Sequence, residues 1–234
     1  MISTILWDVA GTLRDFDAAE RAAIRSLFAE FSLGACTDAM LARYSAINAG
    51  FWQRLERGEM TRPQVLVRRF ERFFGECGID PGLAPAFNEK YQVRLGDTAV
   101  CRDDSLTLVR SLKGKVKQYA VSNGTVVAQT RKLERSGLGA EMDGIFLSER
   151  LGAEKPGAAF FERVFEAIRP RDLSAVMIVG DSLTSDIQGG MNAGIRTCWY
   201  NPGRLPAPAQ YRIDLEIRDL RELSDIILRK ESIP

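Results

Sequence analysis

The first hundred residues contain one short apolar run followed by a long block with helical periodicity. Residues 2–8 are rich in apolar side chains, end at the acid Asp8 and precede Gly11, which predicts a buried β-strand. From Asp17 onward, apolar residues recur at spacings of three and four, the period of an amphipathic helix. Three such stripes lie at Ile24, Leu27, Phe28 and Phe31, at Leu41, Tyr44, Ile47, Phe51, Trp52 and Leu55, and at Leu66, Phe70, Phe73 and Phe74. The pattern therefore predicts only helices in residues 17–96.

Beyond residue 97, strand patterns alternate with helix patterns. Strands are predicted at residues 118–121, 144–147, 175–180 and 196–199, and helices at about 125–135, from Pro156 onward and at about 184–193. This alternation is typical of a parallel, doubly wound sheet. We therefore predict an α/β, Rossmann-like core domain formed by residues 1–16 and 97–234, with residues 17–96 inserted as an all-helical domain. Disorder is expected only in the last residues, 230–234.

Charge and histidine content exclude several classes of protein. The chain has 32 basic and 31 acidic side chains, a formal net charge of +1, and no run of five or more Lys/Arg, so a polymeric nucleic acid is not an expected partner. It has no histidine, which excludes Ser-His-Asp catalysis and histidine-ligated metal sites. Carboxylates acting with a hard ion such as Mg²⁺ become the expected chemistry.

The cysteines and the N-terminal segment indicate a cytoplasmic protein. Cys36, Cys77, Cys101 and Cys198 lie far apart without a Cys-x-x-Cys pair, as expected for reduced thiols. The N-terminus has no basic segment of a signal peptide, and no apolar run approaches the roughly 20 residues that span a bilayer. We therefore expect no membrane association.

Polar residues follow the predicted strands, at the edge of a parallel sheet where ligands bind. They are Asp8, the turn Ser122-Asn123-Gly124, Lys155, Asp181 and Asp186. Acids at neighbouring strand ends repel one another unless a cation lies between them, and Mg²⁺ prefers oxygen ligands. A hydroxyl and main-chain amides at the start of a helix favour an anion, and Lys155 adds a positive charge. The arrangement predicts a phosphate group held beside Mg²⁺.

With these motifs the sequence resembles the haloacid dehalogenase-like hydrolases. The residues that carry the resemblance are Asp8-Val9-Ala10-Gly11-Thr12-Leu13, then Ser122, then Lys155-Pro156, then residues 180–186 (Gly-Asp-Ser-Leu-Thr-Ser-Asp), in the order of the family's four motifs. The helical insertion resembles the C1 cap of that family. Residues 52–59 and Arg68-Arg69-Phe70 are similar to the pyrimidine 5′-nucleotidase branch.

The resemblance implies an Mg²⁺-dependent phosphomonoester hydrolase that forms an aspartyl-phosphate, and a small phosphorylated metabolite, expected to be a nucleoside 5′-monophosphate, as its substrate. It assigns Asp8 as the nucleophile and places Mg²⁺ on Asp8, Asp181 and the main-chain carbonyl of Ala10. The remaining roles fall to Asp186, which would orient metal-bound water or Lys155, and to Ser122, Asn123, Gly124 and Lys155, which would hold the phosphoryl oxygens.

Three cap residues, Trp52, Arg62 and Arg69, are weaker candidates for substrate contacts. Trp52 lies on a helical stripe, which favours a place in the cap core, and exposed arginines more often lie on solvated faces. Arg14 stands where the family pattern has an apolar residue, and the sequence assigns it no role. The natural ester and the oligomeric state are not readable from the sequence.

Ala10 departs from the phosphatase pattern, which has a second aspartate at that position as general acid and base. A methyl group transfers no proton, and positioned acid–base catalysis contributes typically ~10²–10⁴-fold to a rate. We therefore expect this chain to be impaired, and we interpret Ala10 as a laboratory substitution, the alternative being a natural chain that lost or changed its activity. Two rival functions remain: a non-catalytic sensor of a phosphorylated metabolite, and a metal-independent haloacid dehalogenase. Asp181 argues against the dehalogenase, because without a metal this acid would have nothing to bind.

Overall fold

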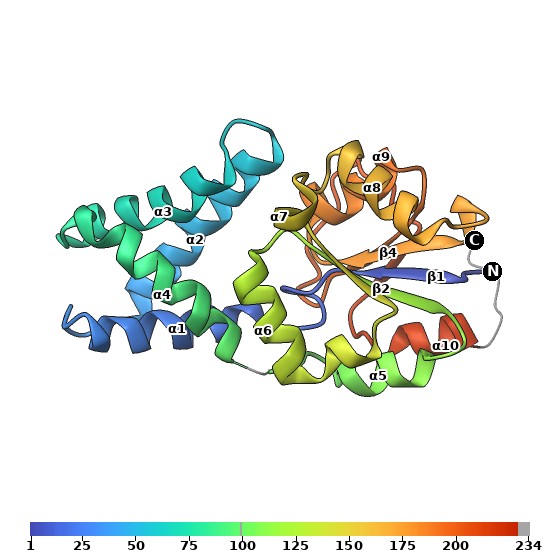
Figure 1. The fold of residues 1–234 in the computed structure, drawn as a ribbon, viewed down its shortest axis with the longest axis horizontal. Helices are drawn as coiled ribbons and strands as arrows, with labels where there is room; N and C mark the ends of the chain where they lie inside the picture. Colours follow the sequence, from blue (N-terminus) through green and yellow to red (C-terminus); the bar gives the residue numbers. More distant parts are fainter. Residues whose placement is uncertain (99, 229–234) are drawn as a thin grey trace. The chain divides into compact units, whose positions relative to one another are not determined.

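A six-stranded parallel β-sheet forms the centre of the larger of two units. The computed structural model describes residues 1–98 and 100–228, and these divide into one unit of residues 1–16 and 100–228 and a second of residues 17–98. The strands are β1 (Thr4–Trp7), β2 (Lys117–Ser122), β3 (Gly144–Leu147), β4 (Val176–Gly180), β5 (Arg196–Tyr200) and β6 (Leu215–Ile217). Their order is β3-β2-β1-β4-β5-β6, with every pair parallel (Figure 1). The α/β class predicted from the sequence is confirmed.

Helices cover both faces of this sheet, because successive residues of a strand point to opposite sides. Ile5 and Trp7 of β1 belong to one apolar cluster, whereas Leu6 belongs to another. The first cluster includes α5 (Ser105–Leu112), α6 (Val126–Ser136) and α10 (Glu222–Leu228), and the second includes α8 (Ala158–Ile168) (Figure 1). The short helices α7 (Ser148–Leu151) and α9 (Gln188–Asn192) complete this unit with 3₁₀ turns at Leu138–Glu141 and Leu173–Ala175 and a π-helical turn at Leu183–Ile187.

The switch point of the sheet lies at β1, since the next strand along the chain, β2, pairs on one side of it and β4 on the other. In a doubly wound sheet, ligands bind outside the carboxyl ends of the strands at such a point. The loops that follow β1, β2 and β4 therefore lie at the expected place for a functional site.

The second unit is all-helical, as its periodicity predicts. It contains α1 (Phe16–Glu30), α2 (Asp38–Glu56), α3 (Arg62–Cys77) and α4 (Ala84–Asp97), with a 3₁₀ turn at Pro81–Leu83. Its core is aromatic: Tyr44 stacks on Phe70 with ring centroids 5.0 Å apart, and Phe87 also lies 5.0 Å from Phe70. The structure places the second boundary of this unit after residue 98 instead of after residue 96, because α4 continues to Asp97.

Several elements differ from the sequence expectations. Strand β6 and helices α5 and α10 were not predicted. The helix expected at 184–193 begins instead with the π-helical turn at Leu183–Ile187. The predicted disorder at 230–234 lies outside the described residues. Among the residues that the structure describes, no helix combines the length and the apolar character needed to cross a membrane.

Candidate functional site

Asp8 is placed by the strand that ends just before it. Its main-chain N–H donates to the carbonyl of Val179 in β4 at 2.9 Å, which holds the first residue of the loop against the neighbouring strand. The side chain is buried, and its Oδ1 accepts a hydrogen bond from Lys155 Nζ at 2.9 Å. Its Oδ2 is also buried but has no hydrogen-bond partner. One carboxylate oxygen of Asp8 is thus anchored, and the other is available to a ligand.

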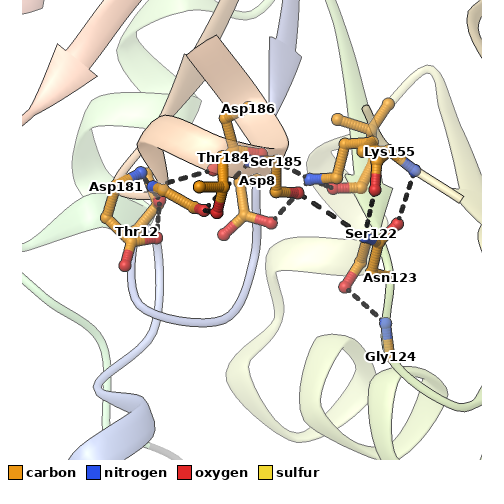
Figure 2. A network of polar contacts seen from close by, with 12 residues as sticks. Asp8, Thr12, Ser122, Asn123, Gly124, Lys155, Asp181, Thr184, Ser185 and Asp186 are labelled. Carbon is orange, nitrogen blue, oxygen red and sulfur yellow. Dashed lines mark hydrogen bonds and ion pairs between the residues drawn. The ribbon is translucent and has the colours of Figure 1, made fainter. Parts of the chain in front are cut away.

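Lys155 is a buried cation whose ammonium group has three acceptors. Besides Asp8 Oδ1, its Nζ donates to Asp186 Oδ1 at 2.6 Å and to the carbonyl of Val121 at 3.1 Å (Figure 2). Burial by itself lowers the pKa of a lysine, but the carboxylates of Asp186 and Asp8 outweigh it and raise the pKa of Lys155. Lys155 therefore stays charged and holds Asp8 and Asp186 in fixed positions.

The side chain of Asn123 binds the backbone of another loop. Its side-chain Nδ2 donates to the carbonyl of Lys155 at 2.8 Å, and its Oδ1 accepts from the main-chain N–H of Lys155 at 2.9 Å (Figure 2). Both ends of the amide are used on the backbone of another loop. The side chain of Asn123 is therefore a clamp for Lys155, and only its main-chain N–H remains for an anion.

Ser122 and Gly124 lie at the turn between β2 and α6. The main-chain N–H of Gly124 donates to Ser122 Oγ at 3.3 Å, and Ser122 is almost fully buried. Thr125 then caps α6, since its hydroxyl accepts from the N–H of Ala128. The turn thus joins a serine hydroxyl to a helix N-terminus, where the helix dipole favours negative charge.

Asp181 is positioned by Thr12 and Trp199. The Thr12 hydroxyl accepts from the main-chain N–H of Asp181 and donates to its Oδ1, both at 3.0 Å. The indole N–H of Trp199 donates to the main-chain carbonyl of Asp181 at 3.0 Å. Gly11, at φ +104°, lets the carboxylate approach, because a Cβ there would lie 2.5 Å from Asp181 Oδ2. These three roles are not readable from the sequence.

Asp8, Asp181 and Asp186 form one acidic cluster within the described chain. A ligand oxygen of each lies within 4.8 Å of the others. Three carboxylates and the single charge of Lys155 sum to −2 when all are ionised. Desolvation, together with the negative charge of Asp8, raises the pKa of both Asp181 and Asp186, although Lys155 opposes this at Asp186. The cluster fits a divalent cation such as Mg²⁺, because its donors are all oxygens, its net charge is negative and Asp8 Oδ2 has no hydrogen-bond partner.

Ala10 and Arg14 complete the loop after β1. The loop closes tightly, since Gly11 N–H donates to the carbonyl of Arg14 and Arg14 N–H to the carbonyl of Val9, both at 3.0 Å. Ala10 is half-buried and ends in a methyl group. Arg14 is buried, and its guanidinium donates to the carbonyl of Lys132 in α6 at 3.1 Å, so it ties this loop to that helix.

The cap residues named from the sequence fall in different environments. Arg69 is only 1% exposed, and its guanidinium donates to Asn48 Oδ1 at 2.8 Å and to Asn88 Oδ1 at 3.1 Å. The predicted substrate contact of Arg69 is therefore wrong, because its donors are used inside the cap. Trp52 is half-buried and packs on a small apolar cluster, and Arg62 is half-buried at the start of α3.

A buried carboxylate that the sequence did not reveal lies in the same network. Asn48 Nδ2 donates to Glu20 Oε2 at 2.8 Å, and Ser45 Oγ donates to Glu20 Oε1. Desolvation raises the pKa of Glu20, against the hydrogen bonds from Ser45 and Asn48 and the charge of Arg69. Asn48 therefore connects a buried acid to a buried base. The sequence hint was a polar residue on an otherwise apolar helical face.

The chain is similar to known proteins over almost its whole length. The pattern of the haloacid dehalogenase-like hydrolase family matches residues 2–194, and the chain belongs to that family. It is 38% identical over 224 residues to YfnB of Bacillus subtilis, named as a HAD-hydrolase, which covers 96% of this chain and 94% of the relative. A crystal structure of YfnB bound to magnesium superposes with a TM-score of 0.91, covering 97% of this chain and 98% of that chain.

Two further relatives indicate to which branch of the family the chain belongs. The chain is 34% identical to the pyrimidine 5′-nucleotidase PynA of Streptococcus pneumoniae over 224 residues, 95% of this chain and 94% of the relative. It is 28% identical to the pyrimidine 5′-nucleotidase YjjG of Escherichia coli over 225 residues, 96% of this chain and 97% of the relative. The chain is therefore a HAD-type hydrolase of the nucleotidase-like branch.

Proposed function

We propose that this chain is built to hydrolyse small phosphate monoesters, specifically pyrimidine nucleoside 5′-monophosphates, with Mg²⁺, and that Ala10 limits its turnover. The observation that carries the proposal is the convergence of Asp8, Asp181, Asp186 and Lys155 beside the Ser122–Gly124 turn. The choice of nucleotides is supported by the names of the PynA and YjjG relatives.

Asp8, Asp181 and the main-chain carbonyl of Ala10 would hold the metal. When bound, Mg²⁺ offsets the repulsion between an attacking carboxylate and a phosphate dianion. Lys155 anchors Asp8 Oδ1, which leaves the unpartnered Oδ2 in a defined direction. Asp186 holds the Lys155 ammonium at 2.6 Å and so fixes that anchor.

The covalent chemistry begins at Asp8. A carboxylate oxygen of Asp8 forms a bond to phosphorus while the bond from phosphorus to the ester oxygen breaks, giving an aspartyl-phosphate and an alkoxide that must take up a proton. Ser122 and the main-chain N–H groups of the turn hold the non-bridging oxygens. Water then attacks the phosphorus, releases inorganic phosphate and restores the Asp8 carboxylate, and this step requires a group that accepts the proton of water.

The methyl group of Ala10 can neither protonate the leaving alkoxide nor accept the proton of the attacking water. The effect should depend on the leaving group, because a ribose 5′-oxygen requires protonation whereas p-nitrophenolate leaves as a stable anion. We therefore expect almost no phosphorylation of Asp8 by nucleotides, partial phosphorylation by p-nitrophenyl phosphate, and accumulation of the covalent adduct because water has no base.

The deciding experiment compares this chain with the variant Ala10→Asp. Both are mixed with Mg²⁺ and either pyrimidine nucleotides or p-nitrophenyl phosphate, and the mass of the quenched protein and the released phosphate are measured. Ala10→Asp should raise nucleotide turnover ~10²–10⁴-fold. A matched control, Ala10→Asn, has a similar size but transfers no proton and should remain slow. If Ala10→Asp is no faster than the starting chain, the acid–base role assigned to this position is wrong.

A sensor function is the second candidate, and Ala10 itself favours it. Such a protein keeps the acidic cluster, Lys155 and the Ser122–Gly124 turn but lacks the proton-transfer group. It would bind a phosphorylated metabolite without consuming it. This candidate predicts tight nucleotide binding in the starting chain and no turnover in Ala10→Asp. A metal-independent dehalogenase would instead release halide from a 2-haloacid in the presence of a chelator.

A further inference from the structure

Gln129 packs against the Ser122–Gly124 turn. It belongs to the first turns of α6, which begins at Val126, and it is only 2% exposed. Its side chain folds back over Gly124: a Cβ at Gly124 would collide with Gln129 Nε2 and lie 2.8 Å from its Cδ and Cγ. Only glycine at position 124 leaves room for this approach, and the amide nitrogen is the atom that comes nearest to the turn.

Among the described residues, the side-chain amide of Gln129 has no hydrogen-bond partner. Its Oε1 is buried without a hydrogen bond, and its side chain makes none within the described part of the chain. Gln118 shows the contrast, because that buried amide accepts from Trp7 Nε1 at 3.1 Å and donates to the carbonyl of Val109 at 2.9 Å. A buried polar group without a partner costs about 1–3 kcal/mol. Of the two amide atoms only Nε2 is a donor, so it is the atom from which an anionic oxygen could accept a hydrogen bond.

The position of this amide indicates its ligand. It faces the turn that joins the Ser122 hydroxyl to the N-terminus of α6, where donors and the helix dipole favour an anion. An amide N–H adds a neutral donor that can bond to an anionic oxygen, a charge-assisted hydrogen bond.

We propose that Gln129 Nε2 donates a hydrogen bond to a non-bridging oxygen of the phosphate group held at the Ser122–Gly124 turn. Gln129 is then a substrate-binding residue outside the four motifs. The proposal rests on the proposed function, because it needs a phosphate group at this turn.

The test measures binding of inorganic phosphate to the full chain in the presence of Mg²⁺, by calorimetry. Gln129→Leu keeps the size of the side chain near Gly124 and removes its donor, so it should weaken phosphate binding about 10-fold, the effect of one charge-assisted hydrogen bond. Its Mg²⁺ affinity should be unchanged. Gln210→Leu makes the same change in an exposed loop and serves as the matched control. Ser122→Ala reports independently on the turn.

The outcomes separate the two proposals. If Ser122→Ala weakens phosphate binding and Gln129→Leu does not, the role of Gln129 is overturned and the proposed function stands. If the starting chain binds no phosphate, both are overturned. If Gln129→Leu does not fold, the side-chain NH₂ resonances of Gln129 in the starting chain, assigned by their loss in Gln129→Glu, decide the matter. They should shift during a phosphate titration, and their constancy would refute the contact.

Discussion

The substitution Arg69→Met tests whether the buried polar network holds the cap together. The guanidinium of Arg69 donates to Asn48, to Asn88 and to the carbonyl of Leu66, and it lies 4.9 Å from the ring centroid of Phe70. Methionine keeps most of the apolar stem and removes the charge and all three hydrogen bonds.

The size of the effect follows from what remains in the core. Asn48 Oδ1 loses its donor, and the buried carboxylate of Glu20, which Asn48 contacts, loses the positive charge that opposes the rise of its pKa. Removing one partner of a buried charged network costs about 3–5 kcal/mol. Two hydrogen bonds to a charged group at roughly 1.5–3 kcal/mol each give a similar total, about 3–6 kcal/mol. We expect the free energy of unfolding of the cap to fall by this amount.

Hydrogen exchange followed by mass spectrometry measures the effect separately in the two units, because peptides from residues 17–98 report on the cap alone. Arg43→Met is the matched control, since Arg43 is an exposed arginine of the same unit that pairs with Glu76, and its loss should change little. Adding Glu20→Gln to Arg69→Met should restore part of the stability, because the uncompensated charge disappears. Equal exchange in Arg69→Met and Arg43→Met would refute the structural role.

Four further predictions concern the site and the cap. Asp181→Asn should weaken Mg²⁺ binding strongly, yet raise the melting temperature of the metal-free protein by relieving repulsion; calorimetry and thermal unfolding check this. Gly11→Ala should destabilise the protein by about 1–3 kcal/mol, because φ is +104° and the new Cβ meets Asp181, and urea unfolding measures it. Asn123→Ala should cost about 1–3 kcal/mol in the same assay by leaving the backbone groups of Lys155 unpaired. The raised pKa of Glu20 means that the folded state binds the proton more tightly than the unfolded state, so stability falls as pH rises from the ordinary glutamate pKa toward the raised value. Urea unfolding at a series of pH values measures this decline, which Glu20→Gln should lack.

The sequence alone predicted the α/β class and most of its strands. Buried parallel strands are short apolar runs, and the sequence predicts five of the six: the strand at the N-terminus and those around residues 118, 144, 176 and 196. Strand β6 has three residues and pairs with β5 at the end of the strand order, so its pattern is too short to identify. Helices α5 and α10 have eight and seven residues, which gives few repeats of the helical period.

The candidate site was predictable in its backbone positions and not in its contacts. Asp8, Lys155, Asp181 and Asp186 could be named because parallel strands end at one edge of a sheet, whatever their spacing in the chain. Which oxygen of Asp8 is anchored by Lys155 depends on side-chain rotamers that no spacing encodes.

The same limit explains the side-chain contacts that the sequence does not reveal. Asn123 lies in the Ser122–Gly124 turn, and its side-chain amide binds the backbone of Lys155, 32 positions away in the chain. Arg69 was assigned as an exposed residue and is buried, because Asn48 and Asn88 from two other helices supply its acceptors.

The sequence by itself thus determined which strand ends carry the residues of the candidate site and that Ala10 cannot transfer a proton, since both are properties of residue type and order along the chain. The tertiary structure decided which buried polar side chains find a hydrogen-bond partner; Gln129 finds none among the described residues. The physical reason is that a buried hydrogen bond depends on distances of about 3 Å between groups remote in sequence, and only the packed fold sets those distances.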